Sequence, residues 1–179
     1  QNLVQEAAQR QGEMRAKPRH PRALILAPTR ELALHIHAEL RRLTGKSKMN
    51  HACVIGGVNQ NPQVKKLRAG VDILVAAPGR LLDLMNQGHI DLSETKFLVL
   101  DECDRLMDMG FIHDLRRIIK HIPKDRQSLF FSATMPTEIA KLSKEILRKP
   151  VRIDVPPEEV TVAKIEQKVV HVKTAQKRA

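Results

Sequence analysis

Asp101 and Glu102 follow directly on the apolar run Phe97-Leu98-Val99-Leu100, and Asp104 comes shortly after them. A short run of this kind predicts a buried strand, and open α/β sheets bind ligands beyond the carboxyl ends of their strands. Paired carboxylates in that place suit Mg²⁺, which prefers oxygen ligands and keeps several waters. In nucleotide hydrolysis the first acid would hold the metal, and the second would orient and deprotonate the attacking water. An acidic helix N-terminus is the simpler alternative, because the helix dipole favours acids there.

Further segments rich in small, basic or hydroxyl side chains follow other apolar runs in the same way. They are Pro28-Thr29-Arg30, Gly56-Gly57, Ala77-Pro78-Gly79-Arg80 and Ser132-Ala133-Thr134. Because the carboxyl ends of parallel strands meet at one edge of a sheet, all of these segments should converge there. Glycine amides and helix N-termini bind anions, and Arg30 and Arg80 add fixed positive charge. The sequence therefore predicts a surface that grips a sugar–phosphate backbone without reading its sequence.

The elements that must position these residues alternate along the chain. The predicted strands are residues 23–27, 52–55, 73–76, 97–100 and 128–131. Helical spacing of apolar side chains recurs in three stretches between or after them: Leu32, Ile36, Leu40 and Leu43; Ile112, Leu115, Ile119 and Ile122; and Ile139, Leu142, Ile146 and Leu147. Apolar strands that alternate with amphipathic helices predict a three-layer α/β domain, in which helices cover both faces of a parallel sheet.

Composition narrows the classes of partner and compartment. The 179 residues suit one domain, and a net charge of +11 favours a polyanionic partner such as nucleic acid. Four Phe residues with no Trp or Tyr argue against binding by base stacking. Cys53 and Cys103 form no CxxC pair, which argues against a disulfide framework or a zinc site and fits a reducing cytoplasm. We expect a soluble, cytoplasmic protein without a membrane partner, since no apolar run approaches the length of a membrane span.

The motifs PTRELA, GG, APGR, DECD and SAT stand in an order and spacing that resemble the DEAD-box branch of the superfamily 2 helicases, over about residues 1–172. The resemblance implies the first RecA-like domain of an ATP-dependent RNA helicase, with ATP and Mg²⁺ as cofactors and RNA as partner. It implies that Asp101 binds Mg²⁺ mostly through water and that Glu102 is the catalytic base. It implies that Asp104 contacts Ser132 and Thr134 and couples hydrolysis to strand separation. The implied RNA-backbone track comprises Pro28, Thr29, Arg30, Gly56, Gly57, Ala77, Pro78, Gly79 and Arg80.

The sequence departs from that family pattern in three respects. Cys103 replaces an alanine, and Ala77 replaces a threonine whose hydroxyl would contact phosphate. The family's adenine-binding segment and its glycine-rich GKT loop do not appear. Gly45-Lys46-Ser47 is no substitute, because Leu40 stands where the loop's first glycine should be and the segment ends a predicted helix. We therefore expect an N-terminally truncated domain that alone neither hydrolyses ATP at a useful rate nor unwinds RNA.

We expect residues 1–154 to form this partial domain, 155–164 a proline-containing linker, and 165–179 the start of a missing second domain or a swapped strand. In the family, the strand feeding the phosphate loop lies inside the sheet. Its loss would leave an unpaired edge or a gap, which a homodimer or strand exchange could cover. Two other functions stay open: a stand-alone RNA-binding or regulatory module, and a Mg²⁺-dependent hydrolase of another phosphate ester. Glu102 and the Ser132-Ala133-Thr134 segment favour the helicase fragment.

Overall fold

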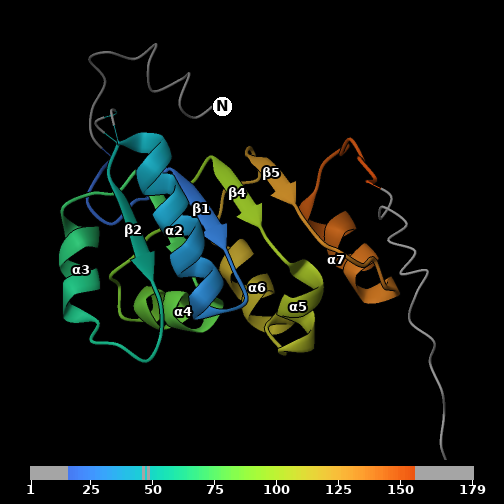
Figure 1. Ribbon diagram of the computed structural model, residues 1–179, viewed down its shortest axis with the longest axis horizontal. Coiled ribbons are helices and arrows are strands. Elements are labelled where there is room, and N and C mark those ends of the chain that lie inside the picture. The colour runs from blue at the N-terminus through green and yellow to red at the C-terminus, as the bar shows by residue number, and fades with distance from the viewer. Residues whose placement is uncertain (1–15, 46, 48, 156–179) are drawn as a thin grey trace, which may run out of the picture. The chain divides into compact units, whose positions relative to one another are not determined.

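The computed structural model describes residues 16–45, 47 and 49–155, which contain a five-stranded sheet (Figure 1). Its strands are β1 (Ala23–Leu26), β2 (His51–Val54), β3 (Ile73–Ala76), β4 (Phe97–Leu100) and β5 (Gln127–Phe130). They are ordered β2-β3-β1-β4-β5, and every neighbouring pair is parallel. The predicted strands and their parallel pairing are confirmed, with ends shifted by at most one residue.

The strands end level with one another, which decides where the segments after them begin. Leu26 pairs with Ala76 on one side and with Leu100 on the other. Val54 and Phe130 extend the same row to the two outer strands. The predicted convergence at one edge therefore holds for the backbone of all five turns.

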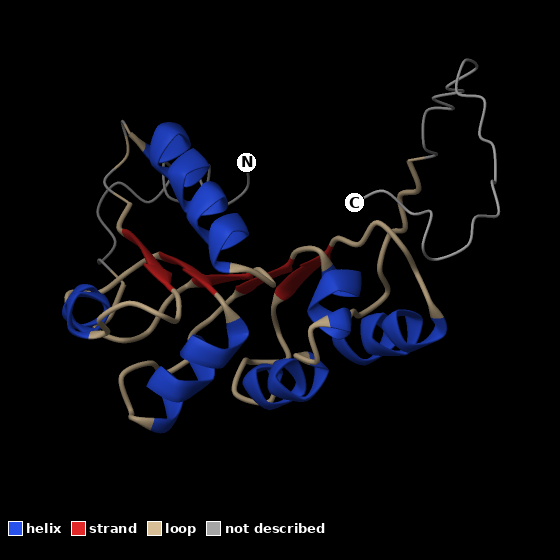
Figure 2. Cartoon of the chain, turned by 60° about the horizontal axis from the view of Figure 1, so that its bottom comes forward, coloured by secondary structure: helices blue, strands red, loops and turns tan. Residues whose placement is uncertain are grey.

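Helices cover the two faces of the sheet unequally. They are α2 (Arg30–Thr44), α3 (Asn61–Arg68), α4 (Pro78–Asn86), α5 (Cys103–Asp108), α6 (Ile112–Ile119) and α7 (Thr137–Ile146). Figure 2 shows one helix on one side of the strands and the others gathered on the opposite side. Helix α2 packs on the side chains of Ile25, Cys53 and Val75, whereas Leu24 and Leu98 point into the larger core formed with the remaining helices. The predicted three-layer α/β architecture is confirmed.

Two helices bury a somewhat different stripe from the predicted one. In α2, Leu32, Ile36 and Leu40 pack on the sheet, but Leu43 is 76% exposed. The buried stripe continues in steps of four residues to Thr44, whose hydroxyl donates to the Leu40 carbonyl at 2.6 Å. The expected burial of Leu43 is therefore wrong.

In α6 the predicted Leu115 is fully buried, as is Ile118, which the spacing argument passed over. Ile112 and Ile119 are only partly buried against the same core. The buried face of this helix is thus centred on Leu115 and Ile118, with Ile112 and Ile119 at its margins.

The outer strand β5 is the least covered part of the sheet. Its side chains alternate between exposed and half-buried, with Leu129 38% exposed and the following Phe131 52% exposed. By contrast, every residue of β3 is buried. Among the described strands, the side chains of β5 are thus more exposed than those of the central strands. The described strands themselves form an uninterrupted sheet, so no gap separates them.

The chain divides after Arg148 into two units. In the second, residues 149–155 are described, and Arg152 Nε lies 2.9 Å from Asp154 Oδ1. Apart from Val155, the predicted linker 155–164 lies outside the described residues, as does the predicted strand 165–172. Among the helices that the structure describes, none has the length and apolar character needed to cross a membrane.

Candidate functional site

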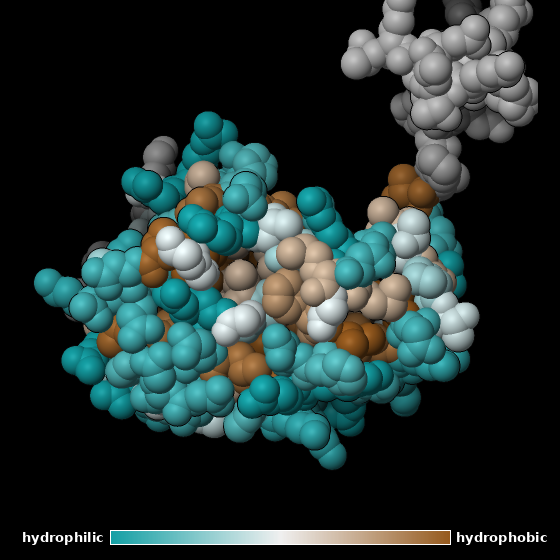
Figure 3. All heavy atoms as spheres, turned by 90° about the horizontal axis from the view of Figure 1, so that it is seen from below, coloured by the Kyte–Doolittle hydropathy of each residue, from teal (hydrophilic) through white to brown (hydrophobic). Residues whose placement is uncertain are grey.

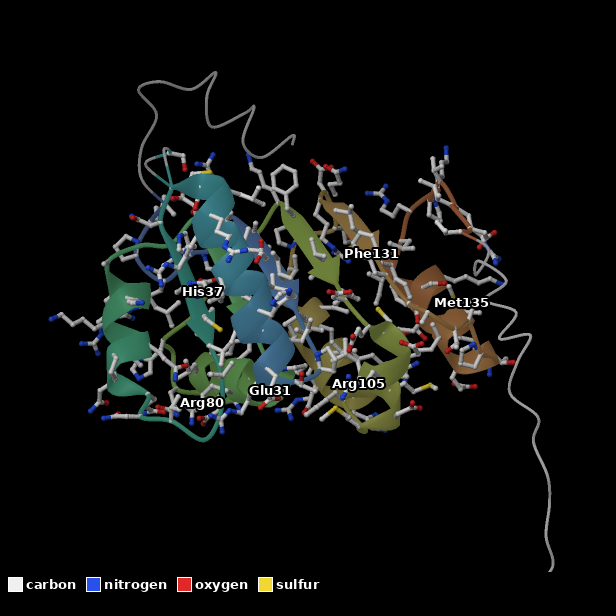
Figure 4. All side chains as sticks on the ribbon, viewed as in Figure 1. Glu31, His37, Arg80, Arg105, Phe131 and Met135 are labelled. Atoms are coloured by element: carbon white, nitrogen blue, oxygen red, sulfur yellow. The ribbon has the colours of Figure 1, made fainter. Side chains whose placement is uncertain are left out.

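The five turns beyond the strands line the edge at the carboxyl ends of the sheet. The backbone ladder runs one step past the strands, because Ala27, Ala77, Asp101 and Phe131 each donate an N–H to a neighbouring strand's carbonyl. Figure 4 shows Glu31, Arg80 and Arg105 along this edge. Viewed from below, the surface is largely hydrophilic with paler and brown areas (Figure 3). The turns thus start from rigidly paired backbone and present mainly polar groups.

The turn after β4 holds Glu102 in an unusual backbone conformation. Its φ and ψ are 45° and 55°, in the left-handed region that side chains with a Cβ rarely adopt. Among the described non-glycine residues, only Arg19 and Lys149 share a positive φ. Asp101 Oδ1 stabilises the turn by accepting a 2.9 Å hydrogen bond from the Glu102 N–H. Strain of this kind gathers at functional sites, where the surrounding structure holds it in place.

The two carboxylates of this turn remain accessible. The Glu102 side chain is 40% exposed and lies 3.4 Å from Arg105 Nη1, an i,i+3 surface pair of the kind that contributes little stability. Asp101 is half-buried, with one carboxylate oxygen engaged by the Glu102 N–H. This oxygen donor set fits Mg²⁺, whose remaining ligands would be water and phosphate oxygens.

Asp104 joins this turn to the turn after β5. Its carboxylate oxygen Oδ2 accepts hydrogen bonds from the Thr134 N–H and hydroxyl, both at 2.9 Å. The Asp104 N–H donates to Ser132 Oγ at 3.1 Å, and Ser132 in turn donates to the Thr134 carbonyl at 2.8 Å. Burial alone would raise the pKa of Asp104, but these hydrogen bonds together with the Arg105 N–H hold it below its usual value. The structure thus brings together the three residues that the sequence predicted to touch.

Cys103 is fully buried and chemically passive. Burial, reinforced by the charges of Asp101 and Asp104, raises its pKa to about 12, so the thiol stays protonated near neutral pH. Its Sγ lies 3.6 Å from the Leu100 carbonyl, and its N–H donates to the Phe131 carbonyl at 3.0 Å. Cys103 therefore belongs to the larger core cluster, together with Leu100 and Leu106.

The turns after β1 and β2 interlock through Arg30 and Gly57. Thr29 caps α2 by accepting a 3.2 Å hydrogen bond from the Leu32 N–H, which leaves Arg30 exposed at the first helical position. Gly57 has a φ of 71°, and a Cβ placed on it would lie 2.3 Å from Arg30 Nη1. The guanidinium therefore rests where only a glycine leaves room. Gly56 has no such constraint.

If RNA lies on the turns that present Arg30 and Gly57, as the family resemblance implies, Gly57→Ala should weaken single-stranded RNA binding about three- to tenfold, because the new methyl displaces the Arg30 guanidinium from its place. Fluorescence anisotropy with a labelled oligonucleotide measures the loss. Gly88→Ala is the matched control, since Gly88 has the same φ of 71° but nothing within 4 Å of its Cβ position. Both variants should lose about 1 kcal/mol of stability from backbone strain, while only the first should lose affinity. Equal affinity losses would contradict the interpretation.

The sequence profile of the DEAD/DEAH box helicase family matches residues 3–142 of this chain. The chain belongs to the DEAD/DEAH box helicase family. It is 47% identical over 133 residues to the DEAD-box ATP-dependent RNA helicase 20 of Arabidopsis thaliana, covering 74% of this chain and 26% of that protein. It is 44% identical over 152 residues to the chloroplastic DEAD-box ATP-dependent RNA helicase 3A of Zea mays, covering 85% and 20%. The DEAD-box resemblance is thereby confirmed, and the chain spans about a fifth to a quarter of these relatives.

In this DEAD/DEAH box domain, Arg80 is placed differently from what the sequence suggested. Its side chain is only 16% exposed, so it is not a free charge on the surface. Nη1 donates to the Val58 carbonyl at 3.2 Å, and Nε lies 3.7 Å from Asp83. Ala77 precedes α4 without a side-chain cap, and Pro78 occupies the first helical position, while Gly79 is exposed. The Arg80 side chain is thus engaged within the domain, and the amino end of α4 has no side-chain cap.

Sequence reasoning missed several polar contacts of this DEAD/DEAH box domain. The contact of Arg105 with Glu102 was not foreseen, nor was the side-chain bridge that joins Gln60, Asp83 and Gln87. No local signal in the sequence points to that bridge, because it joins side chains far apart along the chain.

A second unforeseen contact joins two histidines. His37 Nε2 lies 2.9 Å from His51 Nδ1 on β2. Burial lowers the pKa of both imidazoles, aided for His37 by His51 and for His51 by Arg41. The pair lies between the middle of α2 and the start of β2, away from the carboxyl edge.

Proposed function

We propose that this chain is the part of an ATP-dependent RNA helicase that supplies the hydrolytic carboxylates and one portion of the RNA-backbone grip. One observation carries the proposal: a single sheet edge bears the Asp101–Glu102 turn, its link through Asp104 to Thr134, and the turns that present Arg30 and Gly57. The printed names of the relatives, ATP-dependent RNA helicases, support the same activity. RNA binding alone would not require Glu102 to be held in a strained backbone conformation beside Asp101.

The roles follow from the chemistry of each group. Asp101 would hold Mg²⁺ mostly through water, and the ion would neutralise charge on the nucleotide phosphates. Glu102, whose side chain is 40% exposed, would take the proton of the attacking water. Asp104 would transmit the state of this turn to Ser132 and Thr134 through the hydrogen bonds already formed. RNA would lie over Thr29, Arg30 and Gly57 and over the uncapped end of α4, from Ala77 to Gly79.

By itself the chain is proposed not to hydrolyse ATP. The 179 residues contain no glycine-rich loop of the GxxxxGK[ST] type, whose amides and lysine cradle the β- and γ-phosphates. Gly45 directly follows the end of α2, so Gly45-Lys46-Ser47 does not connect a strand to a helix.

The chain is further proposed to self-associate through its outer strand β5. The exposed side chains of Leu129, on this strand, and Phe131, just after it, support that proposal.

The test uses the 179-residue chain alone. We expect single-stranded RNA of any sequence to bind with an affinity that falls steeply with salt, and ATP turnover to stay at background with or without RNA. Light scattering on the same sample should show a dimer at micromolar concentration. RNA-stimulated turnover would refute the proposed inactivity, absence of RNA binding would refute the proposed grip, and a monomer would refute self-association.

A further inference from the structure

Two of the proposed RNA-contacting turns are tied together from behind by side chains that no motif includes. We propose that Gln60, Asp83 and Gln87 form a brace that fixes the turn of residues 56–60 against α4 and so sets the affinity for an RNA backbone. The inference rests on the proposed function, because it assigns positioning residues to the same binding edge.

The centre of the brace is a pair of facing amides. Gln60 Nε2 donates to Gln87 Oε1 at 3.1 Å, and Gln87 Nε2 donates back to Gln60 Oε1 at 3.4 Å. Gln60 is the residue before α3, and Gln87 is the residue after α4. The pair therefore connects the end of the β2 turn with the far end of the helix that the β3 turn begins.

From Gln87 a series of contacts leads back to the turn of residues 56–60. Gln87 Nε2 also donates to Asp83 Oδ1 at 2.8 Å, and the other Asp83 oxygen lies 3.7 Å from Arg80 Nε. Arg80 Nη1 completes the path by donating to the Val58 carbonyl at 3.2 Å. The bridge thus leaves the turn at its end, Gln60, and returns to its middle, Val58.

Charge supports a positioning role for these residues. A carboxylate on a phosphate-binding edge repels RNA, so Asp83 gains nothing by facing the ligand. Placed beside the largely buried Arg80, it instead orients that guanidinium toward the Val58 carbonyl. Arg80 and Asp83 are accordingly positioning residues, which leaves the exposed Arg30 guanidinium and the backbone amides of the turns to meet phosphate.

The turn has a need for such support. It contains adjacent glycines, one with a φ of 71°, and glycine loses more conformational freedom on ordering than any other residue. A turn that is already fixed avoids that entropic cost when RNA binds. Because Arg30 rests against Gly57, holding the turn also holds the guanidinium in place.

The experiment compares the 179-residue chain with Gln60→Met, Gln87→Met and the double variant, which keep side-chain length and net charge. Single-stranded RNA binding is measured by anisotropy across a range of salt concentrations. We expect each single variant to bind about three- to tenfold more weakly, and the double variant no more weakly than the weaker single one, since one broken link opens the whole path. The slope of log affinity against log salt should fall by about 1, because an unfixed turn no longer holds the Arg30 guanidinium against a phosphate. A merely structural role would leave that slope unchanged.

Asn86→Ala serves as the matched control, because Asn86 is exposed at the same end of α4 and makes no side-chain hydrogen bond to another described residue. It should bind RNA like the wild type. Hydrogen exchange supplies a second readout, with faster exchange expected for the amides of residues 56–60 in the Met variants only. A wild-type chain without RNA affinity would overturn the proposed function and the brace with it. Wild-type binding accompanied by unchanged affinity in both Met variants, or by an equal loss in Asn86→Ala, would overturn the brace alone.

Discussion

In a helicase that contains this chain together with a phosphate-binding loop, Glu102→Gln is expected to lower ATP turnover at least about 100-fold while nucleotide and RNA binding persist. The amide keeps the size and hydrogen-bonding reach of the side chain but cannot accept the proton of the attacking water, and general-base catalysis contributes about 10²–10⁴-fold. The Glu102 carboxylate lies outside the core and its only described partner is Arg105, so the fold does not depend on its charge. Steady-state phosphate release, with RNA binding measured in parallel, checks the outcome.

Glu138→Gln is the control for that experiment. Glu138 makes the same kind of i,i+3 surface pair, with Lys141 Nζ at 2.8 Å, but lies on α7 away from the paired acids. Its loss should leave turnover unchanged. Turnover that survives in Glu102→Gln would show that another group is the base.

Asp104→Ala is expected to destabilise the described domain by about 1–3 kcal/mol, because the Thr134 N–H and hydroxyl and the Arg105 N–H lose their common acceptor. The loss of stability is no larger than this because the Asp104 carboxylate is partly exposed, so water replaces part of the lost hydrogen bonding. Urea unfolding measures the change. Asp125→Ala, at an exposed loop position, should cost less than about 0.5 kcal/mol.

The same carboxylate gives the stability a dependence on pH. The pKa of Asp104 in the folded chain lies below its unfolded value of about 3.9, so the charged form stabilises the fold above that pH. This contribution is lost as the pH falls through the folded-state pKa. Asp104→Asn should therefore show a shallower loss of stability between about pH 5 and pH 2 than the wild type. Parallel curves for the two proteins would mean that the carboxylate is not held by Thr134 as described.

The sequence sufficed to predict the strands and the edge where they end, because short apolar runs and the turns after them report backbone geometry locally. It failed at Leu43, where helical spacing allowed either a three- or a four-residue step and the buried stripe took the four-residue step to Thr44. The exposure of Leu129 on β5 could not be predicted from the strand pattern, since it depends on how the helices lie over the sheet.

Within the site, the contact of Asp104 with Ser132 and Thr134 could be anticipated only through the family resemblance. The left-handed backbone of Glu102 could not be anticipated from a run of acidic residues, which gives no reason to expect a positive φ. The Gln60–Gln87 pair joins side chains 27 residues apart, and the side chain of Arg80 turned inward to the Val58 carbonyl. Such contacts depend on tertiary placement, which spacing along the chain does not encode.

The backbone of Glu102 has an evolutionary consequence. A glycine at position 102 would adopt a φ of 45° without the steric cost that a side chain brings there, so the folded chain would gain stability by losing its acid. Under selection for folding alone, glycine would therefore replace Glu102 over time. A carboxylate is retained at this position only while its chemistry is under selection. A homologue that carries glycine here would mark a lineage in which the domain has kept its fold after giving up hydrolysis.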